Sequence, residues 1–208
     1  MGSARRAHHN DRRAGVDRIE SRNSRCQKDL AFSFRTSLSG VSVDSVEDFA
    51  AEVARFEEWA LHSVSAGEGA AREALTRITS LYMAGLQLPS SSAEEAEYDE
   101  SVTGLPDGIV ANVKGHSGVP FDYYGVVFSP QVIPHEEPVI GSLDDDVRDI
   151  FRDVVTGLRA FESGDRNGAL WEWRERLQDH WGRHAVGAIR SLHIWIAENA
   201  PESLLADD

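Results

Sequence analysis

The stretch that most constrains the fold of this sequence is residues 167–199, which hold four of the five tryptophans and no proline. Its apolar residues recur every three or four positions, the spacing of one face of an α-helix. They are Leu170, Trp173, Leu177, Trp181, Ala185, Ala188, Ile189, Leu192 and Ile196. The pattern predicts one long helix, which would span on the order of 45 Å. Gly182 and Gly187 lie inside it and predict a bend or a close helix crossing there.

Two earlier segments, residues 46–64 and 70–88, carry apolar stripes of the same helical period. Ser45 precedes the first stripe as an N-cap, and Pro89 stops the second. Because only a short glycine-containing turn separates the two helices, we expect them to pack antiparallel. The residues expected to face inward are Val46, Phe49, Val53, Phe56, Ala60, Val64, Leu75, Ile78, Tyr82 and Leu86.

A further helix is predicted to begin after Ser142, which is placed to cap a first turn containing three aspartates. Its apolar stripe runs to residue 161, and Gly164 ends it. With the other segments this gives the predicted fold class, an all-α, up-down helical bundle of about four main helices.

The insert between the second and third of these helices, residues 89–142, is irregular in sequence. Residues 90–101 form a polar, acidic connection, and Pro106 favours a short helix over residues 106–113. Residues 123–128 are aromatic and apolar but too few for a helix of their own. We expect them to lie across the bundle as an extended or singly turned cover.

The charge divides the chain into two parts. Residues 1–40 carry a net charge of +5 and show no sustained period, so they are predicted to be a disordered basic leader. Two alternatives are an arm that binds RNA or an acidic partner, and a true translation start near Val41 or Val43. Residues 41–200 are predicted to form a single helical-bundle domain, with an acidic C-terminal tail at 201–208.

The chain as a whole has a net charge of −14, which leaves −19 for residues 41–208. A domain with this much negative charge repels the phosphate backbone of nucleic acids. We therefore expect no nucleic-acid partner to bind through the folded part. Cys26 is the single cysteine, which excludes an intramolecular disulfide and a cysteine-based zinc site. No apolar run reaches the roughly 18 residues of a membrane span. No membrane partner is therefore expected, and the cytoplasm is the default location.

One group of polar residues points to a possible chemistry. Asp146, Asp149 and Asp153 share one flank of the third helix, and His180 and His184 lie one turn apart on the last. Two imidazoles with one or two carboxylates suit a divalent transition metal, and helical bundles place such ligands on facing helices. The sequence thus allows a metal site between these two helices.

The same residues have an alternative explanation without a metal. The histidines would then be half-buried hydrogen-bond donors to the aspartates, and nearby arginines would pair with the same carboxylates. Those arginines are Arg148, Arg152, Arg174 and Arg183. The motifs of zinc proteases and di-iron bundles are absent, since neither HExxH nor ExxH occurs around His180 and His184.

The two tryptophans Trp171 and Trp173 project about 200° apart on a helix, so one of them is expected in the core. The other packs beneath the aromatic cover or lines a groove. A groove formed with Tyr124 and Arg174 would be a recognition site for a peptide or a planar ligand.

A further pattern runs through the C-terminal part of the chain: a pair of aspartates that opens a helix, a glycine in the following turn, and the tryptophans and small residues of the last segment. These residues are Asp145, Asp146, Gly164, Ala169, Leu170, Trp171, Trp173, Trp181 and Gly182. In this pattern the chain resembles the bacterial domain of unknown function 5063 family. The resemblance covers roughly residues 45–197 and implies a small all-helical domain of bacterial origin with no established activity. The resemblance also implies that some relatives carry Asn or Ser where this chain has His180 and His184, which counts against the metal hypothesis.

Two functional hypotheses follow. The first is a non-enzymatic acidic module that binds a protein partner or regulates one, with no cofactor, because the chain shows no nucleophile motif and no phosphate-binding loop. The alternative is a metal-binding bundle that uses His180, His184 and one of the three aspartates. No catalytic residue is predicted, and the oligomeric state is left open.

Overall fold

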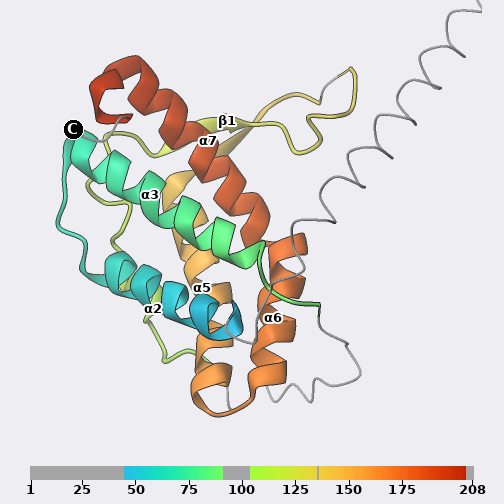
Figure 1. Cartoon of the computed structure of the whole chain (residues 1–208). Coiled ribbons are helices and arrows are strands. Elements are labelled where there is room, and N and C mark those ends of the chain that lie inside the picture. The colour runs from blue at the N-terminus through green and yellow to red at the C-terminus, as the bar shows by residue number, and fades with distance from the viewer. Residues whose placement is uncertain (1–44, 91–103, 135, 205–208) are drawn as a thin grey trace, which may run out of the picture. The chain divides into compact units, whose positions relative to one another are not determined.

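The structure is a computed structural model that describes residues 45–90, 104–134 and 136–204 (Figure 1). The predicted leader at 1–40, most of the acidic connection at 90–101 and the end of the acidic tail lie outside the described residues. Five α-helices and one two-stranded sheet make up the described part, so the predicted all-α fold class is confirmed. Within it, no helix is long and apolar enough to cross a membrane.

The first two helices are α2, Ser45–His62, and α3, Gly67–Gly85. Both predicted helices are present, but each ends two or three residues earlier than expected. Val64 and Leu86 therefore lie beyond the ends of the helices, and their predicted place in the core is wrong: they are 96% and 52% exposed to solvent. Gly67 begins α3 with a φ of 64°, a left-handed conformation that glycine adopts without strain.

The insert contains less helix and more strand than expected. In place of a helix over residues 106–113 there is one short 3₁₀ turn, η2, Val110–Asn112. The aromatic segment is extended, as one of the two expected forms, and makes strand β1, Tyr123–Val126. It pairs antiparallel with β2, Val139–Ser142, which was not predicted. Four residues are too few to show a period, so β2 left no pattern in the sequence.

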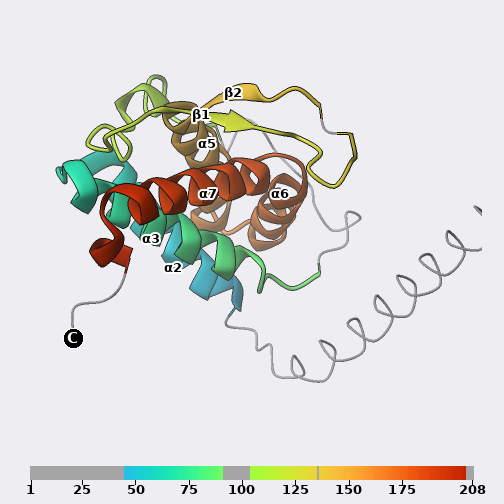
Figure 2. The same cartoon turned by 90° about the horizontal axis from the view of Figure 1, so that it is seen from above.

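The helix α5, Leu143–Glu162, begins as predicted: the Ser142 hydroxyl accepts a hydrogen bond from the Asp145 N–H at 3.2 Å. Gly164, with a φ of 95°, ends the turn that follows it. Seen from above, β1 and β2 lie on the side of α5 and α7 that faces away from α2 and α3 (Figure 2).

The C-terminal segment is helical as predicted, but it is not one continuous helix, and the chain breaks two residues before Gly182, where a bend was expected. The segment forms two helices, α6, Arg166–Asp179, and α7, Trp181–Asn199, which meet at His180. His180 has φ −135° and ψ −85°, outside the helical region. The break is possible because Gly182 has no side chain: a Cβ there would collide with the Leu177 carbonyl. As a result α6 runs beside α5, while α7 crosses to pack on α3 (Figure 1).

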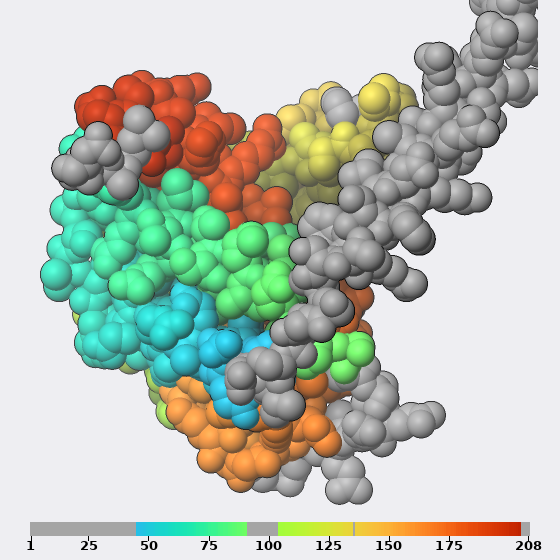
Figure 3. Space-filling model, in the orientation of Figure 1, coloured from blue at the N-terminus to red at the C-terminus, as the bar shows by residue number. Residues whose placement is uncertain are grey.

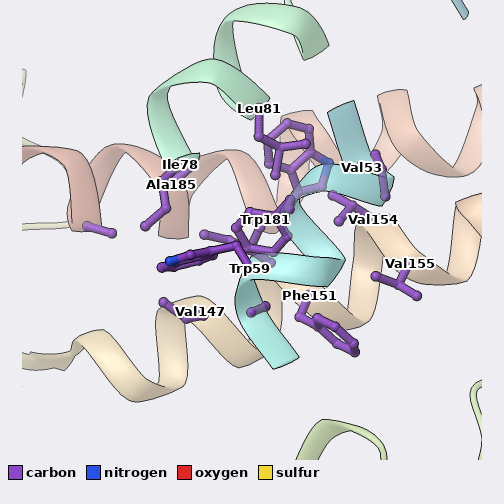
Figure 4. Packing of buried hydrophobic residues seen from close by; sticks show 14 of the residues in the cluster. Val53, Trp59, Ile78, Leu81, Val147, Phe151, Val154, Val155, Trp181 and Ala185 are labelled. Carbon is purple, nitrogen blue, oxygen red and sulfur yellow. The ribbon is translucent and has the colours of Figure 1, made fainter. Parts of the chain in front are cut away.

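The core forms where α2, α3, α5 and α7 meet, and Trp181 lies in its midst (Figure 4). Its ring stacks on Phe49 at a centroid distance of 6.1 Å. Gly85 leaves room for it, since a Cβ on that residue would stand 2.8 Å from the indole. Trp181 therefore fixes the start of α7, one residue after the break, against α2 and α3. The short 3₁₀ helix η3, Pro201–Leu204, closes the described chain.

Candidate metal centre

The flank of α5 that carries the three aspartates faces the start of α7, where the two histidines lie. His180 is the residue of the break itself, and His184 stands one helical turn later. Because α5 and α7 pack together, the two groups meet as the sequence pattern suggested. The structure thus brings all five predicted residues into one cluster.

Two of the aspartates hold the histidines in place. The Nδ1 atom of His180 lies 2.7 Å from an Asp153 carboxylate oxygen, and Nδ1 of His184 lies 2.8 Å from Asp146. Both carboxylates are buried, and each imidazole is partly exposed. A carboxylate bonded to one ring nitrogen fixes the orientation of the imidazole and leaves the other, Nε2, as the nitrogen for a metal.

The third aspartate completes a set of three ligands. Asp149, His180 and His184 each offer one ligand atom, and these atoms lie within 4.8 Å of one another. The carboxylate of Asp149 stands 3.5 Å from Nε2 of His184, and the two imidazole centroids are 4.8 Å apart. Tetrahedral ligands at about 2.1 Å from a metal are about 3.4 Å from each other, so a small inward movement would close the set.

The charge of the cluster favours a cation. Three carboxylates face one guanidinium, that of Arg152, which donates to Asp149. With both imidazoles neutral, two negative charges are left uncompensated within the cluster, the charge that a divalent ion would balance. The other expected arginine pairs are not formed here: Arg148 pairs with Asp144, and Arg174 donates to the Leu88 carbonyl.

The pKa of His184 is raised from its ordinary value. The main cause is the hydrogen bond to Asp146, and the charges of the three aspartates add to it, while burial acts in the opposite direction. Without a metal, His184 is thus more readily protonated than a free histidine. A metal ion and a proton compete for this residue.

This shift predicts a pH dependence of stability for the metal-free protein. Since the folded pKa of His184 lies above its value of 6.5 when free, the charged pair with Asp146 stabilises the folded state fully below pH 6.5. That stabilisation is lost as the pH rises through the folded pKa. We expect the free energy of unfolding of wild type, minus that of His184→Asn, to fall over this range in urea titrations with a chelator present. A difference that rises with pH would contradict the assignment.

Tyr124 also belongs to this cluster, although the sequence assigned it to the aromatic groove. Its hydroxyl donates a hydrogen bond to Asp146, the carboxylate that holds His184. Its ring also lines a hollow of about 320 Å³ between β1 and α7, where Phe121 stacks on Trp195 at 6.1 Å. A depression is visible between α7 and the yellow segment beside it (Figure 3). Tyr124 and Asp146 are 22 positions apart, a distance that no local sequence pattern spans. The sequence therefore carried no signal for their hydrogen bond.

The predicted aromatic groove is not assembled. Trp173 is the one of the two tryptophans that lies in the core, as expected for one of them: it is fully buried, its indole N–H donates to the Val154 carbonyl at 2.8 Å, and it lines no groove. Trp171 is half-buried on α6, and Arg174 is bound to Leu88. Tyr124 belongs to the α5 and α7 cluster instead. The four residues therefore do not line a common surface.

Comparisons with known proteins identify the family. The model of the family described as Domain of unknown function (DUF5063) matches residues 42–198, so the chain belongs to this family. A crystal structure of protein BF1032 from Bacteroides fragilis has a similar fold, with a TM-score of 0.56 at 20% sequence identity. The match covers 76% of this chain and 95% of that one. A search of curated proteins finds no match to the chain.

Proposed function

We propose that this member of the family binds one divalent transition-metal ion through Asp149, His180 and His184. The observation that carries the proposal is the convergence of one ligand atom each from Asp149, His180 and His184, which lie within 4.8 Å of one another. The Nδ1–H groups of His180 and His184 donate to Asp153 and Asp146, which leaves Nε2 of each ring for the ion. Such bonds are the usual outer contacts of histidines that bind a metal through Nε2.

The ligand types narrow the choice of ion. Two imidazole nitrogens and one carboxylate oxygen suit zinc, iron, cobalt or manganese better than calcium or magnesium, which prefer oxygen ligands. Asp149 supplies negative charge, while Asp146 and Asp153 hold a proton on each Nδ1 and make Nε2 more basic. Three protein ligands leave further coordination positions for water. The proposal concerns metal binding and assigns no reaction.

A titration of the metal-free protein tests the proposal. We expect Co²⁺ to bind with one ion per chain, followed by visible absorption, and Zn²⁺ to displace it. Asp149→Asn should weaken the affinity by at least about tenfold, since it removes a charged ligand. Asp145→Asn is the matched control, because Asp145 is an exposed aspartate one turn earlier on the same helix. Absence of binding in wild type, or equal affinity in both variants, would refute the site.

The hypothesis of an interaction module stays a second candidate, and one observation favours it. Large apolar side chains are exposed on and beside the two strands, among them Tyr123, Phe128, Ile133 and Ile140. Exposed apolar side chains that gather in one place mark interaction sites. Since the folded part is strongly acidic, the partner would be a basic protein. The hypothesis fails if a purified basic partner binds wild type and Ile140→Ser equally in calorimetry.

A further inference from the structure

A chain of three side chains connects strand β1 to the metal centre. The Tyr124 hydroxyl donates to Oδ2 of Asp146, and Oδ1 of the same carboxylate lies 2.8 Å from Nδ1 of His184. Both oxygens of Asp146 are therefore occupied, one by each neighbour. A carboxylate held at both oxygens cannot rotate, so the orientation of the His184 ring depends on where the tyrosine stands.

The tyrosine hydroxyl occupies a space left open by a glycine of α7. A Cβ at Gly187 would stand 2.7 Å from the Tyr124 oxygen and farther from the rest of the ring. Gly187 lies three residues after His184, on the same helix. An alanine there would push the hydroxyl, and with it the tyrosine ring, away from Gly187, since the atoms it would meet belong to the Tyr124 side chain and not to the backbone. Gly187 thus permits the hydrogen bond to Asp146.

Tyr124 remains a donor over the working range of pH. Burial raises the pKa of its phenol above the ordinary range, and the hydrogen bond and the charge of Asp146 act in the same direction. The hydroxyl therefore keeps its proton. Asp146 for its part is buried, so it has little access to water as a substitute partner.

We infer that Tyr124 is a positioning residue for the metal centre: it fixes Asp146, and through Asp146 the His184 ring, so that the position of strand β1 sets the metal affinity. The inference rests on the proposed function and adds to it a means of control. Tyr124 touches no metal ligand in this scheme and acts through Asp146 alone.

Two variants break the same hydrogen bond in different ways. Tyr124→Phe removes the hydroxyl, and Gly187→Ala pushes it away, while all three ligands and both outer aspartates remain. We expect each to weaken Co²⁺ affinity by about tenfold, the lower end of the effect of losing an outer contact. The double variant should be no weaker than either single variant, because both act on one bond. Tyr123→Phe is the matched control, since Tyr123 is 72% exposed on the same strand, and should bind like wild type.

A structural role would give a different result. Both variants leave one oxygen of the buried Asp146 without the tyrosine, but alanine is a better helix former than glycine by about 1 kcal/mol. Gly187→Ala should therefore lower the thermal unfolding temperature of the metal-free protein less than Tyr124→Phe does. Similar losses of affinity with different losses of stability are the outcome that supports positioning.

Three results would overturn the inference while leaving the proposed metal site intact. They are wild-type affinity in Tyr124→Phe, fully additive losses in the double variant, and a loss in Tyr123→Phe equal to that in Tyr124→Phe. If wild type binds no cobalt, the proposed function and the inference both fail.

Discussion

Replacing His180 and His184 together with asparagine is expected to lower metal affinity by more than about 100-fold, beyond what the loss of an outer contact costs. The asparagine amide places a donor near the position of Nδ1, so Asp153 and Asp146 keep their hydrogen bonds. The Nε2 ligands are lost. We expect the metal-free variant to unfold within about 1 kcal/mol of wild type, because the buried carboxylates stay paired. Calorimetric titration with Zn²⁺ and urea unfolding measure the two quantities.

Two comparisons sharpen this prediction. His193→Asn changes an exposed histidine of the same helix and should leave affinity unchanged. His184→Ala, unlike the asparagine variant, leaves Asp146 without its imidazole partner and should lose about 1–3 kcal/mol of stability as well as affinity. If the double asparagine variant binds Zn²⁺ like wild type, the histidines are structural hydrogen-bond donors and the metal assignment is wrong.

The largest effect on stability is expected from Trp181→Ala. The indole is fully buried, and it is held between α2 and α3 against Phe49 and Gly85. Its removal should cost about 3–5 kcal/mol, the range measured for large aromatic residues in packed cores. Because Trp181 directly follows His180, loosening it should also disturb the break that positions both histidines. Urea unfolding with a chelator present measures the loss.

Ile194→Ala is the control for this prediction, since Ile194 is 43% exposed on the same helix. It should cost well under about 1 kcal/mol, as surface substitutions usually do. Equal losses in the two variants would mean that α7 does not pack through its tryptophan, contrary to the fold described above.

The helices were predictable where one face alone is apolar. The stripe and the Ser142 cap of α5 depend only on neighbours within a turn or two, and both are found as expected. The same reasoning placed Asp146, Asp149 and Asp153 on one flank, with His180 and His184 opposite. For the aspartates and the histidines to meet, the third and the last predicted helices needed only to pack side by side, and short connections favour such packing.

Gly182 indicated a bend in this segment, but a complete break at His180 was not predictable, because the apolar period runs through it without interruption. The contact between Gly182 and the Leu177 carbonyl fixes the break, and that contact requires the fold. The same limit applies to the roles of the aspartates. Asp146 and Asp153 accept from the Nδ1 atoms of the histidines, whereas Asp149 lies with the atoms that could bind a metal. This division depends on how α5 and α7 are rotated about their axes, which the sequence does not show.

Long-range contacts account for the remaining errors. Tyr124 reaches Asp146 from a strand whose partner, β2, is too short to leave a pattern. The apolar stripe already included Trp173, but that it, and not Trp171, fills the core depends on Gly157 of α5, which leaves space for its indole.

Anomalous diffraction from crystals grown with Co²⁺, recorded at the cobalt absorption edge, tests the central claim most directly. We predict a peak between α5 and the start of α7, about 2.1 Å from the Asp149 carboxylate and from Nε2 of His180 and His184. A peak at any other position, or no peak in protein saturated with the ion, would contradict the account.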